Sequence, residues 1–227
     1  MRDLRPDLAT LWSVASRLRP QQGARTIMFV AARSGEGTSS MAASFALIAA
    51  EHAERTAWLV SLELTENADY DAFDIGFAKN VARPGRAFDA SLGCAPMYEL
   101  MPAARGSAKL LTAHPVAGTR LLVTRFRTER LAVGQTVRLR SQAGWWQALR
   151  RSTDWIIVDA PALDRSDAAL DVASEADGVV LVVQAESTGA EEVANAQLAI
   201  ERRGGYVIGV VLNRMRADAR FAGRIAS

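Results

Sequence analysis

A glycine-rich loop between an apolar run and an alanine-rich segment most constrains the fold of this chain. Ile27-Met28-Phe29-Val30 is short and wholly apolar, as expected of a strand buried on both faces of a parallel sheet. The loop that follows contains Gly35 and Gly37, and Ser39 to His52 then carries apolar residues at helical spacing. A strand, a glycine loop and a helix in this order predict a phosphate site, because loop N–H groups and the helix N-terminus attract anions.

The loop departs from the Walker pattern G-x-x-x-x-G-K-[ST] at two positions. It reads Ala32-Arg33-Ser34-Gly35-Glu36-Gly37-Thr38-Ser39, so Ala32 replaces the first glycine and Thr38 replaces the lysine. The lysine ammonium neutralises charge on the β- and γ-phosphates, a contact worth about 1.5–3 kcal/mol. Threonine supplies one neutral hydrogen bond, and the only lysines, Lys79 and Lys109, are far away in the sequence. We therefore expect weak anion or nucleotide binding without efficient phosphoryl transfer.

Apolar runs alternate with helical segments along much of the chain, which predicts an α/β fold. The expected architecture is P-loop NTPase-like, with a mostly parallel central sheet flanked by helices on both faces. Predicted strands are Arg25–Ala32, Ala57–Leu62, Trp155–Val158, Gly178–Val183 and Tyr206–Leu212, and predicted helices are Asp7–Leu18, 39–52 and Ala190–Arg203.

The middle of the chain gives weaker patterns. Strands are predicted over Tyr98–Met101, Leu121–Phe126 and Thr136–Arg140, and a helix over Trp145–Arg150. Because no repeat or linker divides the chain, we expect residues 1–227 to form a single domain, with a variable arginine-rich segment at about 65–151.

Apolar runs and cysteine content indicate where the chain works. The longest apolar runs are far shorter than the roughly 20 residues needed to cross a bilayer, and the N-terminus lacks the apolar core of a secretory signal. The single cysteine, Cys94, excludes an internal disulfide and suits a reducing compartment. The expected location is the cytoplasm, with peripheral attachment to the inner membrane only through a partner.

Three further stretches follow the order of a known family. They are Ala57–Thr65, Asp154–Pro161 with Asp159 as its acidic residue, and 167–213 with its two apolar runs. Together with Gly35-Glu36-Gly37-x-Ser39, they resemble the cytoplasmic kinase domain of bacterial tyrosine kinases (BY-kinases) of capsule and exopolysaccharide production. These kinases are relatives of the ParA/MinD group of ATPases.

The departures from that family fall on its catalytic and assembly positions. Its second acidic strand ends D-x-D-x-R, where this chain has Ser61, Glu63 and Thr65. Its N-terminal pattern E-x-x-R-x-x-R falls on Asp7, Thr10 and Ser13. Its C-terminal tyrosine cluster has no counterpart, because the last tyrosine is Tyr206. The resemblance thus predicts a degenerate member of the family.

The resemblance also implies a set of site residues. Asp159 and Glu63 are the catalytic candidates, and Ser39 and Asp159 are the candidate Mg²⁺ ligands. The nucleotide- and phosphate-binding candidates are Arg33, Ser34, Gly35, Glu36, Gly37, Thr38, Ser39 and Ser40.

Each candidate has a structural alternative. Asp159 would otherwise cap a nearby loop or helix, Ser39 would cap its own helix, and Glu63 would be a solvated loop acid. Arg33 stands where ParA/MinD proteins carry a signature lysine. It either compensates for Thr38, within one chain or across a homodimer, or is a solvated loop residue.

A second feature is a basic segment with a tryptophan pair. Between residues 120 and 151 there are eight arginines and one acid, Glu129, an excess that favours acidic partners or anionic surfaces. Because no aromatic residue of the stacking kind interleaves with these arginines apart from Phe126, we expect no sequence-specific nucleic-acid recognition. Trp145-Trp146 is predicted to be half core and half exposed, with partner docking as an alternative.

Three functions remain open at this level. The favoured one is a non-catalytic or weakly nucleotide-binding scaffold or regulator in exopolysaccharide or capsule biosynthesis and export. It would bind ATP or ADP with Mg²⁺ weakly, or no cofactor, and would dock on the cytoplasmic tails of an inner-membrane polysaccharide copolymerase. The alternatives are an active ATPase or tyrosine autokinase with an atypical site, and a ParA/MinD-like positioning ATPase.

Overall fold

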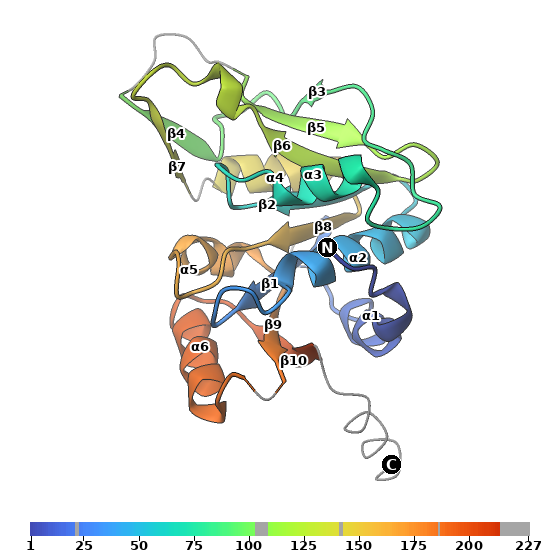
Figure 1. The fold of residues 1–227 in the computed structure, drawn as a ribbon, viewed down its shortest axis with the longest axis vertical. Helices are drawn as coiled ribbons and strands as arrows, with labels where there is room; N and C mark the ends of the chain where they lie inside the picture. Colours follow the sequence, from blue (N-terminus) through green and yellow to red (C-terminus); the bar gives the residue numbers. More distant parts are fainter. Residues whose placement is uncertain (21–22, 103–108, 141–142, 186, 214–227) are drawn as a thin grey trace.

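An eight-stranded sheet runs through the centre of the molecule (Figure 1). The computed structural model describes residues 1–20, 23–102, 109–140, 143–185 and 187–213. The strand order is β10-β9-β1-β8-β2-β6-β5-β3, and the six strands from β10 to β6 run parallel to their neighbours. The remaining two pairs, β6 with β5 and β5 with β3, are antiparallel. This confirms the predicted α/β architecture with a mostly parallel sheet.

The strands agree closely with the sequence prediction at both ends of the chain. The predicted ones are β1 (Arg25–Ala31), β2 (Ala57–Ser61), β4 (Tyr98–Met101), β6 (Leu121–Phe126), β7 (Thr136–Leu139), β8 (Trp155–Asp159), β9 (Gly178–Gln184) and β10 (Val207–Asn213). The structure adds β3 (Phe88–Asp89) and β5 (Leu111–Pro115), and it pairs β4 with β7 in a separate two-stranded sheet.

Helices cover both faces of the large sheet. They are α1 (Ala9–Ala15), α2 (Thr38–His52), α3 (Ala68–Ile75), α4 (Ala143–Ser152), α5 (Ala168–Val172) and α6 (Ala190–Arg202). The predicted first helix is shorter than expected, because a separate 3₁₀ turn (Arg5–Asp7) precedes α1. Helices α3 and α5 had not been predicted. Among the described residues, no helix is long and apolar enough to span a bilayer.

Alternate residues of the central strands enter two apolar cores, one on each face of the sheet. Ile27 and Phe29 of β1 pack with α1, α2 and α3, whereas Met28 and Val30 pack with α4, α5 and α6. All four side chains are fully buried. A strand buried on both faces carries no polar alternation, which is why β1, β8 and β9 are continuous apolar runs.

The tryptophan pair of α4 is part of the core. Trp145 and Trp146 are both fully buried, so the prediction that they are half exposed is wrong. Trp145 Nε1 donates a hydrogen bond to the Ala90 carbonyl at 2.9 Å. Residues around Ala90 and Met97, which lie far from α4 in the sequence, cover the helix and bury both rings.

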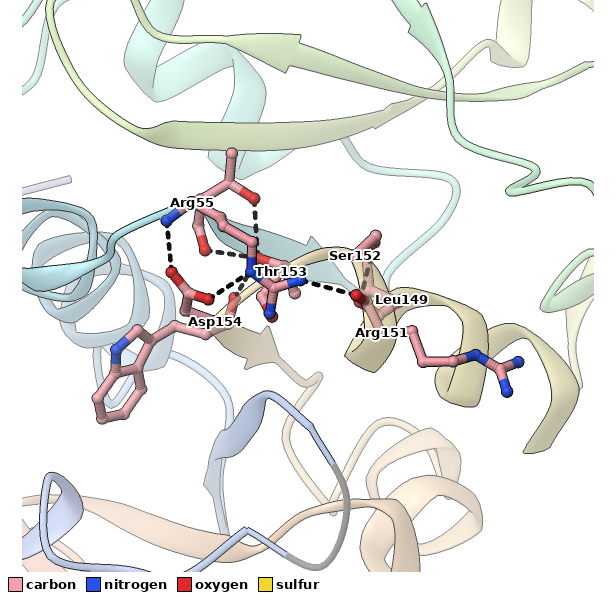
Figure 2. Close-up of polar contacts among 8 residues, drawn as sticks. Arg55, Leu149, Arg151, Ser152, Thr153 and Asp154 are labelled. Carbon is pink, nitrogen blue, oxygen red and sulfur yellow. Dashed lines mark hydrogen bonds and ion pairs between the residues drawn. The ribbon is translucent and has the colours of Figure 1, made fainter.

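A polar network joins the two turns that enter β2 and β8 (Figure 2). Arg55 Nε donates to Asp154 Oδ1 at 2.7 Å, and the Arg55 N–H donates to Asp154 Oδ2 at 2.6 Å. The Arg55 guanidinium also donates to the Arg151 carbonyl at 2.7 Å and to the Thr153 carbonyl. One arginine side chain thus binds the last turn of α4, the Thr153 carbonyl and the Asp154 carboxylate, and it ties the turn before β2 to the turn before β8.

Candidate functional site

The predicted phosphate loop, residues 32–39, connects the carboxyl end of β1 to α2 (Figure 1). Gly35 and Gly37 adopt left-handed φ angles of 85° and 94°. A Cβ atom on Gly37 would also lie 2.1 Å from Asn213 Nδ2. Only glycine satisfies both conditions without rearrangement, which accounts for the Walker-type glycine at this position.

Glu36 holds the loop from within the protein. Its side chain is buried, with 3% exposure, and its carboxylate accepts hydrogen bonds from the N–H groups of Arg33 (3.0 Å) and Gln184 (2.9 Å) and from the Thr188 hydroxyl. Asn213 Nδ2 donates to the Glu36 carbonyl at 2.7 Å. The Glu36 carboxylate therefore faces β9 rather than the space above the loop, and its side chain positions the loop.

A cavity of about 270 Å³ lies above the loop, where β1, β2 and β8 end. Small-molecule sites typically measure about 300–1,000 Å³, so this space suits phosphate groups better than a whole nucleotide. It lies where the strand order changes direction, because β8 separates β1 from β2. The predicted site residues that line it are Arg33, Ser34, Gly35, Gly37, Thr38, Ser39, Ser40, Glu63 and Asp159. Ser61, at the altered catalytic position of the related family, lines it too. The structure adds Glu66, Ala68, Ala160, Pro161, Ala162 and Arg165.

The start of α2 leaves hydrogen-bond donors open toward this cavity. The N-cap is Gly37, and no side chain caps the helix. The first N–H groups of a helix have no acceptor within it, so they carry partial positive charge that an anion can satisfy. The Ser40 hydroxyl accepts a hydrogen bond from the Arg2 N–H at 3.3 Å and so lies toward the N-terminal segment.

Both arginines at the cavity are already paired with carboxylates. Arg33 forms an ion pair with Glu192 at the start of α6. Arg165 lies 3.1 Å from Glu66 and 3.9 Å from Glu63. Within the part of the chain that the structure describes, an anion entering this site would have to displace one of these partners to gain a positive charge, because Thr38 carries none.

Neighbouring contacts hold the other loop residues. Ser34 donates from its N–H (3.1 Å) and its hydroxyl (2.8 Å) to Asp164. Glu63 accepts a hydrogen bond from the Thr65 hydroxyl at 2.8 Å. Ser34 is thus oriented by the loop that follows β8, and Glu63 by a residue of its own loop.

Asp159 lies at the bottom of the cavity, beside a carboxylate that sequence reasoning missed. It ends β8, opposite Ser61 of β2 in the strand register, and is 7% exposed. Asp69, in the first turn of α3, is 1% exposed and close enough for each carboxyl group to alter the pKa of the other. Burial, followed by the charge of Asp159, raises the pKa of Asp69 well above its usual value.

Burial also raises the pKa of Asp159 to about 6, although the adjacent Ser39 hydroxyl and Asp69 carboxyl group oppose the shift. Three oxygens of the pair, Asp69 Oδ1 and Oδ2 and Asp159 Oδ1, have no hydrogen-bond partner among the described residues. Oxygen-rich surroundings of this kind, beside the Ser39 hydroxyl, fit a hard cation such as Mg²⁺. Ser39 and Asp159 would hold it, and a cation there would neutralise charge on a bound phosphate.

Replacing Asp159 with asparagine is expected to change how stability depends on pH. Below about pH 4 the carboxyl group is protonated in both the folded and unfolded states, so it imposes no penalty. Above about pH 6 the folded wild type must bury a carboxylate, so its free energy of unfolding should fall between these two pH values. The asparagine variant should gain roughly 2–3 kcal/mol relative to the wild type across this range.

Urea unfolding in the presence of a chelator, repeated from pH 4 to pH 7, measures this difference. Asp71→Asn, at an exposed position on α3, is the matched control and should follow the wild-type profile. Parallel profiles for the wild type and Asp159→Asn would show that the buried carboxyl group does not titrate as inferred.

The basic segment is less available than its composition suggests. Of its eight arginines, Arg125 pairs with Glu129 at 2.9 Å and Arg140 with Glu99 at 3.6 Å. Arg150 is buried and pairs with Asp177 at 3.1 Å. Three of the eight charges are thus balanced within the protein, and the surface excess is smaller than the sequence count.

No protein-family model matches the sequence, and no curated protein matches it. Solved structures do match. The VpsO kinase domain aligns with a TM-score of 0.61 and 16% identity, over 94% of this chain and 95% of that one. MinD in the MinC:MinD complex of Aquifex aeolicus aligns with a TM-score of 0.53 and 16% identity, over 88% and 72%. An ATP complex of a McdA variant from Cyanothece aligns with a TM-score of 0.52 and 16% identity, over 90% and 78%. The chain therefore has the P-loop NTPase-like fold shared by a kinase domain, MinD and McdA, which is the fold that its resemblance to BY-kinases and ParA/MinD proteins predicted.

Proposed function

We propose that this protein binds the phosphates of ATP or ADP weakly, with Mg²⁺, and does not transfer a phosphoryl group efficiently. The observation that carries this proposal is a preformed phosphate loop beside which the described arginines, Arg33 and Arg165, are both paired with carboxylates. Gly37 and Glu36 set the loop conformation, and Thr38 stands at the lysine position. The loop thus keeps the donors that bind an anion and lacks the charge that stabilises a transferring phosphoryl group.

The proposed role is that of a scaffold or regulator of polysaccharide assembly and export. Support comes from the resemblance to BY-kinases and from the fold shared with the VpsO kinase domain. In this role the protein would work in the cytoplasm and dock on the cytoplasmic tails of an inner-membrane copolymerase. A homodimer, as the ParA/MinD resemblance suggests, would bring the Arg33 surfaces of two copies near each other's loops.

A second candidate is an ATPase or autokinase with an atypical site. The buried pair of Asp159 and Asp69 favours it, because it supplies the second carboxylate that Ser61 lacks. Arg165 favours it too, since release from Glu66 would place a guanidinium at the cavity.

Calorimetry with Mg-ATP and Mg-ADP, combined with a radiolabelled hydrolysis and autophosphorylation assay, separates the candidates. For the proposed function we expect saturable binding with a Kd on the order of 0.1–1 mM, and neither hydrolysis nor labelling above a protein-free control. Asp159→Ala should abolish the Mg²⁺ dependence of binding.

Two results would contradict the proposal. Turnover at the roughly 1–100 s⁻¹ typical of kinases would establish the second candidate instead. No binding at millimolar nucleotide would show that the loop is retained as architecture alone.

A further inference from the structure

The first turn of α3 brings a carboxylate to the phosphate loop from an element that the sequence did not predict. Asn67, the N-cap residue, pairs with the backbone of Phe126 at the end of β6. Its Nδ2 donates to the Phe126 carbonyl at 3.0 Å, and its Oδ1 accepts from the Phe126 N–H at 2.8 Å. This two-point attachment places the helix start over the carboxyl ends of the strands, with Asp69 directed inward beside Asp159.

The two carboxyl groups have no protein cation between them. Among the described residues, neither Asp69 nor Asp159 forms an ion pair within 4 Å, and Arg165 engages Glu63 and Glu66 instead. Two adjacent carboxylates in a dry interior repel each other and lose hydration. Their negative charge is therefore stable there only when a proton or a metal ion neutralises part of it. Three oxygens of the pair, Asp69 Oδ1 and Oδ2 and Asp159 Oδ1, are buried and have no hydrogen-bond partner among the described residues.

We propose that Asp69 and Asp159 together form the acidic half of a divalent-cation site, completed by the Ser39 hydroxyl, at the base of the phosphate loop. Asp69 thereby replaces the strand-end carboxylate that is missing at Ser61. The inference rests on the proposed function, because a cation held here would meet a phosphate bound on the loop.

The number of ligands suits Mg²⁺ or Mn²⁺ better than a cation that needs an all-protein cage. Among the described residues, no group of three or more histidine, cysteine, aspartate or glutamate side chains gathers around one point. Mg²⁺ is usually held by one or two carboxylates, with water and phosphate oxygens in its remaining positions. Two aspartates and a serine, of which Asp159 and Ser39 line the phosphate cavity and Asp69 is buried beside Asp159, match this arrangement.

The test uses Mn²⁺ alone as the probe. Metal-free full-length protein is titrated with Mn²⁺, and the electron paramagnetic resonance signal of free aqueous Mn²⁺ measures how much is bound. We expect one saturable site in the wild type and a loss of affinity of about tenfold or more in Asp69→Asn. Asp71→Asn, two residues along the same helix and exposed, should bind as the wild type does.

Folding is controlled independently of binding. The thermal midpoint of each protein is measured with and without Mn²⁺, because a bound cation stabilises only a folded site. Mn²⁺ should raise the midpoint of the wild type and of Asp71→Asn, and should leave that of a folded Asp69→Asn unchanged.

The proposal is overturned if the wild type shows no saturable Mn²⁺ site, or if Asp69→Asn binds Mn²⁺ with wild-type affinity. Because no nucleotide is present, this result is separate from the proposed function. Protein that binds Mn²⁺ through Asp69 but no nucleotide would retain the cation site and lose the nucleotide role. Nucleotide binding that persists in the wild type when no Mn²⁺ site is found there, and that is unaffected by Asp69→Asn, would support the nucleotide role and overturn the cation site.

Discussion

A Thr38→Lys variant is expected to bind Mg-ATP roughly ten- to a hundredfold more tightly than the wild type. Thr38 lies in the first turn of α2 and lines the phosphate cavity, and the loop around it already has its Walker-type glycine conformation at Gly37. An ammonium group there adds a charge-assisted contact of about 1.5–3 kcal/mol, and each 1.4 kcal/mol is a factor of ten in affinity. The gain should be larger for ATP than for ADP, because the lysine contacts the β- and γ-phosphates.

Calorimetry at constant ionic strength measures this effect, with Thr38→Gln as the matched control. Glutamine is also longer than threonine but carries no charge, so it isolates the ammonium from the added length. Equal affinities for the lysine and glutamine variants would mean that phosphate does not bind where the loop predicts. We expect no matching gain in hydrolysis, because Arg33 and Arg165 stay paired with carboxylates and so do not stabilise a transferring phosphoryl group.

Replacing Arg150 with methionine is expected to lower the free energy of unfolding by about 3–5 kcal/mol. Arg150, at the end of α4, is 5% exposed and bonds to the Asp177 carboxylate at 3.1 Å and to the Ala24 carbonyl at 3.2 Å. Asp177 also accepts a hydrogen bond from the Thr26 N–H at 2.7 Å, so its carboxylate stays buried when the guanidinium is removed. An uncompensated buried charge costs far more than the pair itself contributes.

Urea denaturation followed by circular dichroism measures this loss. Arg151→Met, at the exposed neighbouring position, is the control and should change stability by no more than about 0.5 kcal/mol. The double variant Arg150→Met/Asp177→Asn should recover part of the loss, because it removes the stranded charge as well. Similar stabilities for the Arg150 and Arg151 variants would show that the buried pair does not hold α4 against the sheet.

The burial of Arg150 and its pairing with Asp177 could not be predicted from the sequence. The residue was counted among eight arginines available to acidic partners, because a local sum of charges contains no information on burial. Its partner, Asp177, lies 27 positions further along the chain. The tryptophans of α4 were misjudged for the same reason, since the residues that cover them come from around Ala90 and Met97.

Local patterns were enough to predict the parallel strands of the sheet and the phosphate loop. Strands buried on both faces are continuous apolar runs, and a loop that needs left-handed φ angles beside a crowded amide needs glycine. The lost lysine was equally visible, because Thr38 occupies a defined place in a short motif. These features depend on neighbours within a few residues, so they can be read from the chain itself.

Only the tertiary structure shows how the charges of the site are paired, and it adds Asp69, Glu66 and Arg165 to the predicted ones. Asp69 reaches Asp159 because Asn67 attaches α3 to Phe126, a residue 59 positions away. Arg33 is drawn to Glu192, and Arg165 to Glu66, by contacts that no motif encodes. The sequence by itself determined that a phosphate loop without its lysine would form. The folded structure determined that a buried carboxylate from α3 stands at its base, because the electrostatics of a site depend on distances between segments that are remote in sequence.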